Sequence, residues 1–190
     1  MSIYTKRGDD GDTSLPNERM TKFHPKVEAL GAIDELNAHI GFARSLCSEP
    51  HLHARLEQIQ QELFDVGTIV AMESNEPHEG LHEATKEMER LIDQWTEELP
   101  PLQQFILPSG TSLSASLHIA RTICRRAERE VVRAHHTAAL SFHMRQYMNR
   151  LSDFLFLFAR KVNALAGQKE EIYVRGSDVF QTKKRKSRKE

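Results

Sequence analysis

The sequence is poor in the features that mark secreted and membrane proteins. Its two cysteines, Cys47 and Cys124, are too few for a disulfide framework and lack the spacing of metal ligands, which favours a reducing compartment. The first residues lack the apolar run of a signal peptide, and no apolar run reaches the roughly 18 residues of a membrane span. We therefore expect a cytoplasmic protein that does not enter a membrane.

The charge balance also excludes a basic nucleic-acid-binding domain. The formal net charge is −1, and residues 183–190 hold six basic residues and one acidic residue. The other 182 residues therefore carry a net charge of −6, whereas a nucleic-acid-binding domain is basic. We expect residues 1–182 to form a single domain and residues 183–190 to be a disordered basic tail.

Apolar residues recur at steps of three and four through most of the chain, which is typical of helices with one buried face. Three such segments follow Pro25, Pro50 and Gly80, and two more span about residues 111–136 and 141–166. No stretch has a convincing strand pattern, and residues 1–25 look irregular. The pattern predicts an all-α protein, a five-helix bundle over residues 26–166.

The fourth helical segment carries an unusual row of charges. Arg121, Arg125 and Glu128 share one face at helical spacing, Arg129 flanks that face, and Arg126 points elsewhere. One interpretation is a solvated face, in which each i, i+4 ion pair contributes only about 0.2–0.5 kcal/mol. The other is a row of guanidinium groups that binds phosphates, because arginine presents a planar fork of donors. Composition alone favours the first interpretation.

The N-terminal stretch Thr5-Lys-Arg-Gly-Asp-Asp-Gly-Asp-Thr-Ser-Leu15 combines two glycines with nearby donors. Such a segment can surround phosphates with backbone N–H groups. It is not a Walker A loop, because no G-K-[ST] follows at the required spacing. Taken alone, it is more typical of an acidic turn.

Three other features have open interpretations. The stretch from His78 to His82 matches H-E-x-x-H, a zinc hydrolase motif, but Pro77 and Gly80 place it at a helix start, where surface histidines are more typical. Phe105 lies in a proline-rich apolar connection, which favours packing on the bundle. Asp34, beside the apolar stripe of the first helix, and Arg160, opposite the apolar arc of the fifth, are expected to be exposed.

Five motifs, in their order and spacing, resemble the PduO-type ATP:cob(I)alamin adenosyltransferases. They are Thr5-Lys-x-Gly-Asp-x-Gly-x-Thr, Glu28-Ala-Leu-Gly-Ala-Ile-Asp-Glu-Leu-Asn37, Phe105-Ile-Leu-Pro-Ser-Gly110, the row from Arg121 to Arg129, and Asn149-Arg-Leu-Ser-Asp153. Each motif is weak alone, but together they are specific and cover about residues 3–166. This resemblance favours the phosphate-binding interpretation of the arginine row.

The resemblance implies a homotrimer of five-helix bundles with active sites at the subunit interfaces. The implied enzyme transfers the 5′-deoxyadenosyl group of ATP to the Co(I) of a reduced corrinoid, forming adenosylcobalamin and releasing triphosphate. Its substrates are ATP and cob(I)alamin, with Mg²⁺ as cofactor and no dedicated protein metal site. A reductase and an adenosylcobalamin-dependent enzyme are implied partners.

The resemblance also implies roles for individual residues. The N-terminal loop of one subunit would bind ATP through Thr5, Lys6, Arg7, Gly8, Thr13, Ser14 and Lys22. The neighbouring subunit would bind the same ATP through Arg125, Arg126, Glu128, Arg129 and Asn149. Arg121 would pair across the interface with Asp34, and Phe105 would cover the lower axial face of cobalamin. Of these residues, Arg121, Arg125, Glu128 and Phe105 are the expected catalytic set.

The sequence departs from the family pattern at Ser109, where a second glycine is usual, and at Arg7 and Asp12, which replace small or uncharged residues. Two alternatives therefore stay open. One is a helical nucleotide-binding module without turnover, and the other is a zinc hydrolase that uses His78 and His82.

Overall fold

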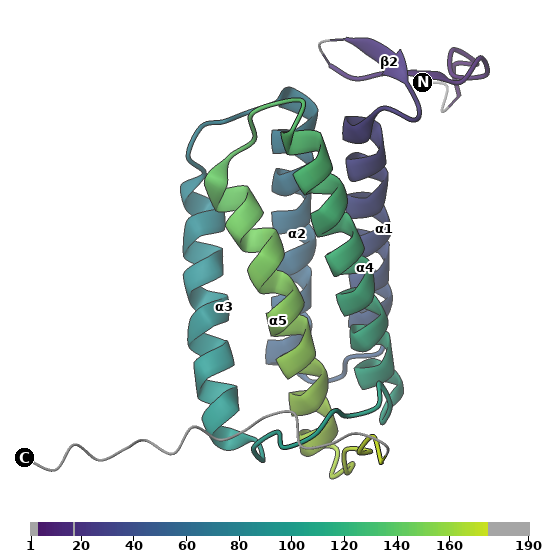
Figure 1. The fold of residues 1–190 in the computed structure, drawn as a ribbon. Helices are drawn as coiled ribbons and strands as arrows, with labels where there is room; N and C mark the ends of the chain where they lie inside the picture. Colours follow the sequence, from purple (N-terminus) through teal and green to yellow (C-terminus); the bar gives the residue numbers. More distant parts are fainter. Residues whose placement is uncertain (1–3, 17, 175–190) are drawn as a thin grey trace, which may run out of the picture.

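The structure is a computed structural model in which residues 4–16 and 18–174 are described. Five helices run alternately up and down in one bundle (Figure 1). They are α1 (Pro25–Ser45), α2 (Pro50–Met72), α3 (Glu79–Glu98), α4 (Ser112–His135) and α5 (Phe142–Leu165). The predicted all-α five-helix bundle is confirmed. The basic segment 183–190 lies outside the described residues.

The N-terminal segment is more regular than its sequence indicates. Two short strands, β1 (Asp12–Ser14) and β2 (Arg19–Thr21), pair antiparallel, with Thr13 opposite Met20. The expectation of an irregular segment is therefore wrong here. The sequence did not reveal the strands because three residues are too few to establish an alternating pattern. The hairpin lies beyond the end of the bundle at which α1 begins (Figure 1).

Local side chains and prolines determine where the helices begin. Pro25 and Pro50 occupy the first turns of α1 and α2, where a missing N–H group costs no hydrogen bond. The side chains of His24, Glu49 and Thr111 accept hydrogen bonds from backbone N–H groups at the starts of α1, α2 and α4. These caps explain why the observed helix starts lie close to those predicted.

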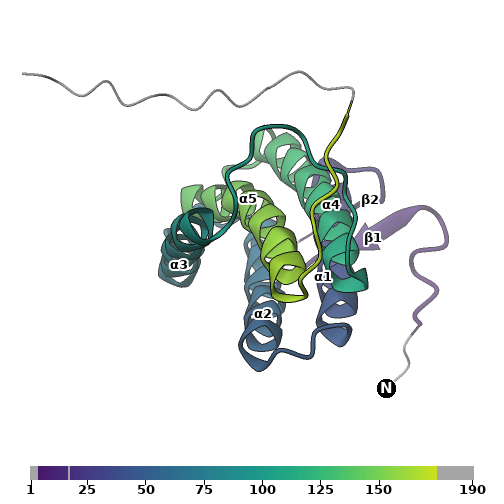
Figure 2. The same ribbon diagram turned by 90° about the horizontal axis from the view of Figure 1, so that it is seen from below.

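α5 lies between α3 and α4, while α1 and α2 close the other side of the bundle (Figure 2). The predicted apolar face of α4 is confirmed, since all of its members are buried: Leu117, Ala120, Ile123, Cys124, Ala127 and Val131. Tyr147, Phe154 and Phe158 are the largest fully buried side chains, and all three belong to α5. α5 is therefore the centre of the core.

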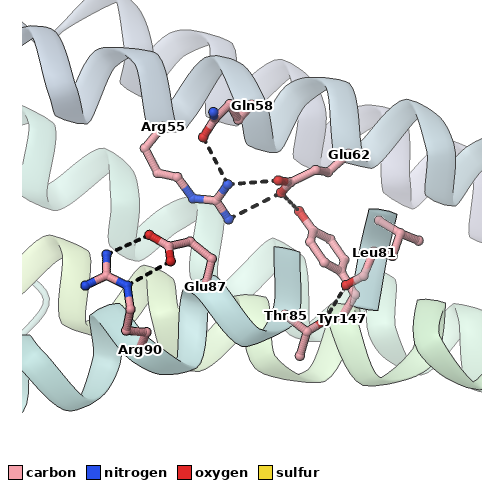
Figure 3. A network of polar contacts seen from close by, with 8 residues as sticks. All are labelled: Arg55, Gln58, Glu62, Leu81, Thr85, Glu87, Arg90 and Tyr147. Atoms are coloured by element: carbon pink, nitrogen blue, oxygen red, sulfur yellow. Dashed lines mark hydrogen bonds and ion pairs between the residues drawn. The ribbon is translucent and has the colours of Figure 1, made fainter. Parts of the chain in front are cut away.

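A polar network joins α2 to α5 inside this core (Figure 3). The guanidinium of Arg55 donates to Glu62 at 2.8 Å, and Glu62 accepts a second bond from the hydroxyl of Tyr147 at 2.7 Å. Burial, followed by the neighbouring charge of Glu62, raises the pKa of Tyr147 well above its ordinary value. The network gives partners to the Tyr147 hydroxyl, the Glu62 carboxylate and the terminal nitrogens of Arg55, groups that would otherwise be costly to bury, while the buried Nε of Arg55 has no hydrogen-bond partner among the described residues.

The expectation that Arg160 is exposed is wrong, because its exposed fraction is only 4%. Its guanidinium donates to the Pro100 carbonyl at 2.7 Å and forms an ion pair with Glu170. Both partners lie outside the helices, in segments that cover the end of α5. Among the described residues, no helix is long and apolar enough to span a bilayer.

Candidate active site

A cavity of about 610 Å³ opens on the bundle where α3, α4 and α5 meet. Its lining contains Glu89, Ile92 and Asp93 from α3, Arg121 and Arg125 from α4, and Arg150, Ser152, Asp153, Phe156 and Leu157 from α5. The volume is in the range of pockets that hold small molecules and cofactors. Two members of the predicted arginine row therefore face one concave site.

Arg121 is partly buried in this cavity. Its guanidinium lies 6.0 Å from the centre of the Phe156 ring, which is within range of a cation–π contact. Its Nε is buried and has no hydrogen-bond partner among the described residues. Burial, and then the charge of Arg125, lowers the pKa of Arg121. The site thus holds a cation whose charge is not compensated within the described part of the chain.

The other arginines around the cavity differ in their partners. Arg150 is neutralised by Glu89 at 3.0 Å and Asp153 at 2.9 Å. No described carboxylate forms an ion pair with Arg121 or Arg125. Two guanidinium groups thus remain without an ion pair in the cavity, whose lining also includes the carboxylate of Asp93.

Beyond Arg125, the row spreads over different surfaces. One turn further along α4, Glu128 accepts a 2.8 Å hydrogen bond from the side-chain amide of Asn149. Arg129 donates to the Arg125 carbonyl at 2.9 Å. Arg126 points toward α1, where it forms an ion pair with Glu35. The chain thus brings Glu128 and Asn149 together, but it does not bring Arg126 to the cavity.

The N-terminal residues expected to bind ATP, from Thr5 to Lys22, form a separate group. Lys22 donates through Nζ to the Gly8 carbonyl at 2.7 Å, and Gly11 adopts a φ of +88°, which favours glycine. Lys6 also has a positive φ, of 59°. None of these residues lines the cavity of the same chain. Thr5, Lys6, Arg7 and Ser14 are exposed, as is Lys22.

Two more of the predicted residues lie away from the cavity. Asp34 is exposed on α1, and the described chain contains no ion pair between it and Arg121. Phe105 is 52% exposed, so its ring is not part of the buried core. Its segment is held instead by backbone pairing: the Tyr173 N–H donates to the Phe105 carbonyl at 2.8 Å, and Leu107 donates to Glu171 at 2.7 Å.

The zinc-motif histidines are not brought together as a ligand pair. His78 precedes α3 and its Nδ1 accepts the Leu81 N–H at 3.2 Å, while the His82 ring stacks on His143. The donor atoms that do approach, within 4.8 Å of one another, belong to Glu79, His82 and Glu83. Glu83 forms a 2.8 Å ion pair with Lys86.

Sequence reasoning missed several residues that shape the site. Arg150 follows Asn149 directly in a motif already recognised, so its position was a usable signal. Phe156 belongs to the apolar run of α5, and helical periodicity does not show which edge of a helix borders a cavity. Its place in the cavity lining could therefore not be predicted.

The family model described as "Cobalamin adenosyltransferase" matches residues 3–162. The corrinoid adenosyltransferase of Bacillus subtilis (strain 168) is 43% identical over 185 residues, covering 95% of this chain and 96% of that protein. The corrinoid adenosyltransferase MMAB of Homo sapiens is 41% identical over 183 residues, covering 91% of this chain and 73% of that protein.

Solved structures agree with these relatives. A variant PduO-type ATP:corrinoid adenosyltransferase from Lactobacillus reuteri, complexed with cobalamin and ATP, superposes with a TM-score of 0.88. It is 38% identical, and the match covers 94% of this chain and all of that one. Another variant of that enzyme, complexed with ATP, gives a TM-score of 0.84 at 39% identity, covering 90% and 99% of the two chains. The chain belongs to the cobalamin adenosyltransferase family.

Proposed function

We propose that this protein transfers the 5′-deoxyadenosyl group of ATP to the Co(I) of a reduced corrinoid, forming adenosylcobalamin and releasing triphosphate. The observation that carries the proposal is the cavity in which Arg121 and Arg125 have no carboxylate partner among the described residues. Paired arginines would only stabilise the fold, whereas two uncompensated guanidinium groups in a concave site are suited to a polyphosphate. Relatives with 38–43% identity carry this activity in their names.

The chemistry explains which side chains the site needs. The nucleophile is cobalt, so the reaction requires no activated serine, cysteine or histidine. The leaving group is triphosphate, and negative charge moves onto it as the carbon–oxygen bond breaks. Fixed positive groups that face this charge lower the barrier, and they also hold ATP in line with the metal of the substrate. Arg121 and Arg125 are placed to do so.

The remaining phosphate-binding groups come, in this proposal, from a second copy of the chain. The N-terminal segment in which Lys6, Gly8 and Lys22 flank the hairpin lies apart from the cavity of its own chain, so one chain contains both halves of a site without joining them. An exposed Asp34 and an uncompensated Arg121 also fit a pair made across an interface. We therefore propose a homotrimer with ATP between the hairpin of one subunit and α4 of its neighbour.

Mg²⁺ fits the side chains on the phosphate-binding face. This ion is commonly held by one or two carboxylates together with substrate phosphates. Glu128 offers a carboxylate one turn from Arg125, and the Asn149 amide fixes its orientation. Bound there with ATP, Mg²⁺ would neutralise part of the phosphate charge.

Phe105 is the proposed contact of the corrinoid. A phenyl ring offers no donor atom to cobalt and excludes water, so it favours loss of the lower axial ligand and makes the metal easier to reduce. A reductase and an adenosylcobalamin-dependent enzyme are the proposed partners, in the cytoplasm. The domain would comprise residues 1–182, with the nucleotide segment in residues 1–25, the bundle in residues 26–166 and a basic tail in residues 183–190.

The deciding experiment mixes the protein with ATP and chemically reduced cob(I)alamin and records the visible spectrum. We expect conversion to adenosylcobalamin, with one triphosphate released per corrinoid. Binding of ATP without any spectral change would instead favour the nucleotide-binding module. The zinc hydrolase would instead be favoured if elemental analysis found one zinc ion per chain and the protein showed hydrolase activity without adenosyl transfer.

A further inference from the structure

Lys26, in the first turn of α1, is a buried cation that joins three separate parts of the chain. Its exposed fraction is 3%, and its Nζ contacts Glu18 Oε1 at 2.8 Å and Glu73 Oε1 at 2.8 Å. Burial by itself lowers the pKa of Lys26, but the hydrogen bonds to Glu18 and Glu73 outweigh it and raise the pKa overall. Lys26 is therefore charged at neutral pH.

The two carboxylates belong to different elements. Glu18 lies in the turn between β1 and β2, where its carbonyl also accepts the Leu15 N–H at 2.9 Å. Glu73 follows α2 and ends that helix. Figure 1 shows that the hairpin, the start of α1 and the end of α2 all lie at the same end of the bundle. Lys26 thus connects the hairpin turn to the helical body.

Two features indicate that these ion pairs are more than surface contacts. A cation at a helix N-terminus opposes the helix dipole, so Lys26 depends on its two carboxylates. Glu73 has a φ of +54°, a left-handed conformation in which glycine would be less strained. A glutamate in this position provides a carboxylate to Lys26 that glycine would lack.

The hairpin turn is also connected to the glycine loop. β2 leads from Glu18 to Lys22, whose Nζ donates to the Gly8 carbonyl at 2.7 Å. Arg19 in β2 donates to the Arg7 carbonyl at 3.1 Å. A continuous series of polar contacts thus runs from Lys26 to the loop proposed to bind phosphates.

We propose that Lys26, with Glu18 and Glu73, is a positioning residue that fixes the nucleotide-binding hairpin on the bundle. This inference rests on the proposed function for its kinetic consequences only. The three side chains touch no reacting atom. Their effect is to reduce the conformational freedom that the hairpin loses when ATP binds, so they lower the KM for ATP without changing the rate of the bound complex.

The test uses Glu18→Gln, which keeps the shape of the side chain and removes its charge. With Glu73 still paired to Lys26, the bundle should stay folded while the hairpin is released. We expect the KM for ATP to rise about 5–30-fold, which corresponds to about 1–2 kcal/mol, because glutamine can still accept a hydrogen bond from Lys26 but no longer carries the charge. The kcat at saturating ATP and the KM for the corrinoid should stay within about twofold, because Glu18 contacts neither the corrinoid nor the reacting atoms. Glu76→Gln, at an exposed glutamate outside these contacts, is the matched control and should change neither constant.

A second measurement is independent of activity. Trypsin cleaves after Arg7, Arg19 and Lys22, which are exposed in the hairpin segment. Glu18→Gln should be cut there faster than the wild type and Glu76→Gln, at an unchanged thermal unfolding temperature. Equal cleavage rates, or a lower kcat at an unchanged KM for ATP, would overturn the positioning role. If the wild type formed no adenosylcobalamin while the cleavage difference persisted, the proposed function would fail and the attachment of the hairpin would stand.

Discussion

The side-chain amide of Asn149 on α5 donates a 2.8 Å hydrogen bond to the carboxylate of Glu128 on α4. The bond links two of the three helices that line the cavity, one turn beyond Arg125. If Glu128 helps to hold Mg²⁺, the amide acts as the outer partner that orients a metal ligand. Loss of such a partner typically costs about 10–100-fold in metal affinity or activity.

Asn149→Ala should therefore raise the Mg²⁺ concentration required for half-maximal adenosyl transfer by about 10–100-fold. Asn149 is exposed, so the thermal unfolding temperature should hardly change. The measurement is a Mg²⁺ titration of the initial rate at saturating ATP. An unchanged Mg²⁺ requirement would remove Glu128 from the proposed metal-binding role.

Arg125→Lys should impair catalysis far more than folding. Lysine keeps the charge but loses the planar fork of donors, and loss of one preorganised contact to the transition state typically costs about 10²–10³ in kcat. Arg133→Lys is the matched control, because Arg133 lies on the same helix and its one ion pair among the described residues is with Glu130 in the adjacent turn, at 2.9 Å. Near-normal turnover of Arg125→Lys at saturating ATP would contradict the role assigned to this arginine.

Asp34 and Arg121 should form a pair between subunits. Breaking one side of a buried ion pair costs about 3–5 kcal/mol, because the other charge is left without compensation. Asp34→Ala should therefore weaken assembly more than the double change of both residues to apolar side chains. Sedimentation of the wild type, both single variants and the double variant at decreasing concentration gives the coupling energy. Simple additivity would exclude a direct pair.

Phe105→Ala should affect the corrinoid and not ATP. The ring is half exposed, so little stability depends on it, and its segment stays fixed by backbone pairing with residues 171–173. Activity with cobalamin that must be reduced on the enzyme should fall severely, while the dissociation constant for ATP changes little. The spectrum of bound Co(II)-cobalamin with ATP should lose its four-coordinate component.

Leu107→Ala is the control for Phe105, because Leu107 lies in the same segment and is 43% exposed. It should keep the four-coordinate signal. A Phe105→Ala variant with greatly weakened ATP binding and an unchanged spectrum would assign the ring to the nucleotide pocket instead.

His118 should make the fold less stable in acid. Burial, and secondly the charge of Arg121, lowers the pKa of His118 from 6.5 to about 4, although Glu170 acts in the opposite direction. The unfolded chain then binds the proton more tightly, so stability falls as the pH drops from 6.5 toward 4. The loss should be about 3 kcal/mol.

His118→Gln should remove this part of the pH dependence. Denaturant unfolding of both proteins at pH values across this window provides the comparison. An equal loss of stability in the wild type and the variant would show that other groups account for it.

The helices and their buried faces follow from the sequence because both depend on short distances along the chain. A helix turns by a fixed angle per residue, so the spacing of Leu117, Ala120 and Cys124 already states that they share a face. Pro25 and Pro50 mark helix starts through their own backbone geometry. The family motifs could also be recognised from the sequence, because each is a short run of consecutive residues.

Other features depended on which distant segments come together. Lys26 and Arg160 look like ordinary surface residues of amphipathic helices, and they are buried only because Glu18, Glu73, Pro100 and Glu170 approach from elsewhere in the chain. The cavity likewise forms only where three helices lie together. The periodicity of one helix does not predict which other helices will pack beside that helix. Local stereochemistry is encoded residue by residue, whereas the burial and pairing of charges are decided by the packing of the whole chain, because only that packing removes water and brings partners to hydrogen-bonding distance.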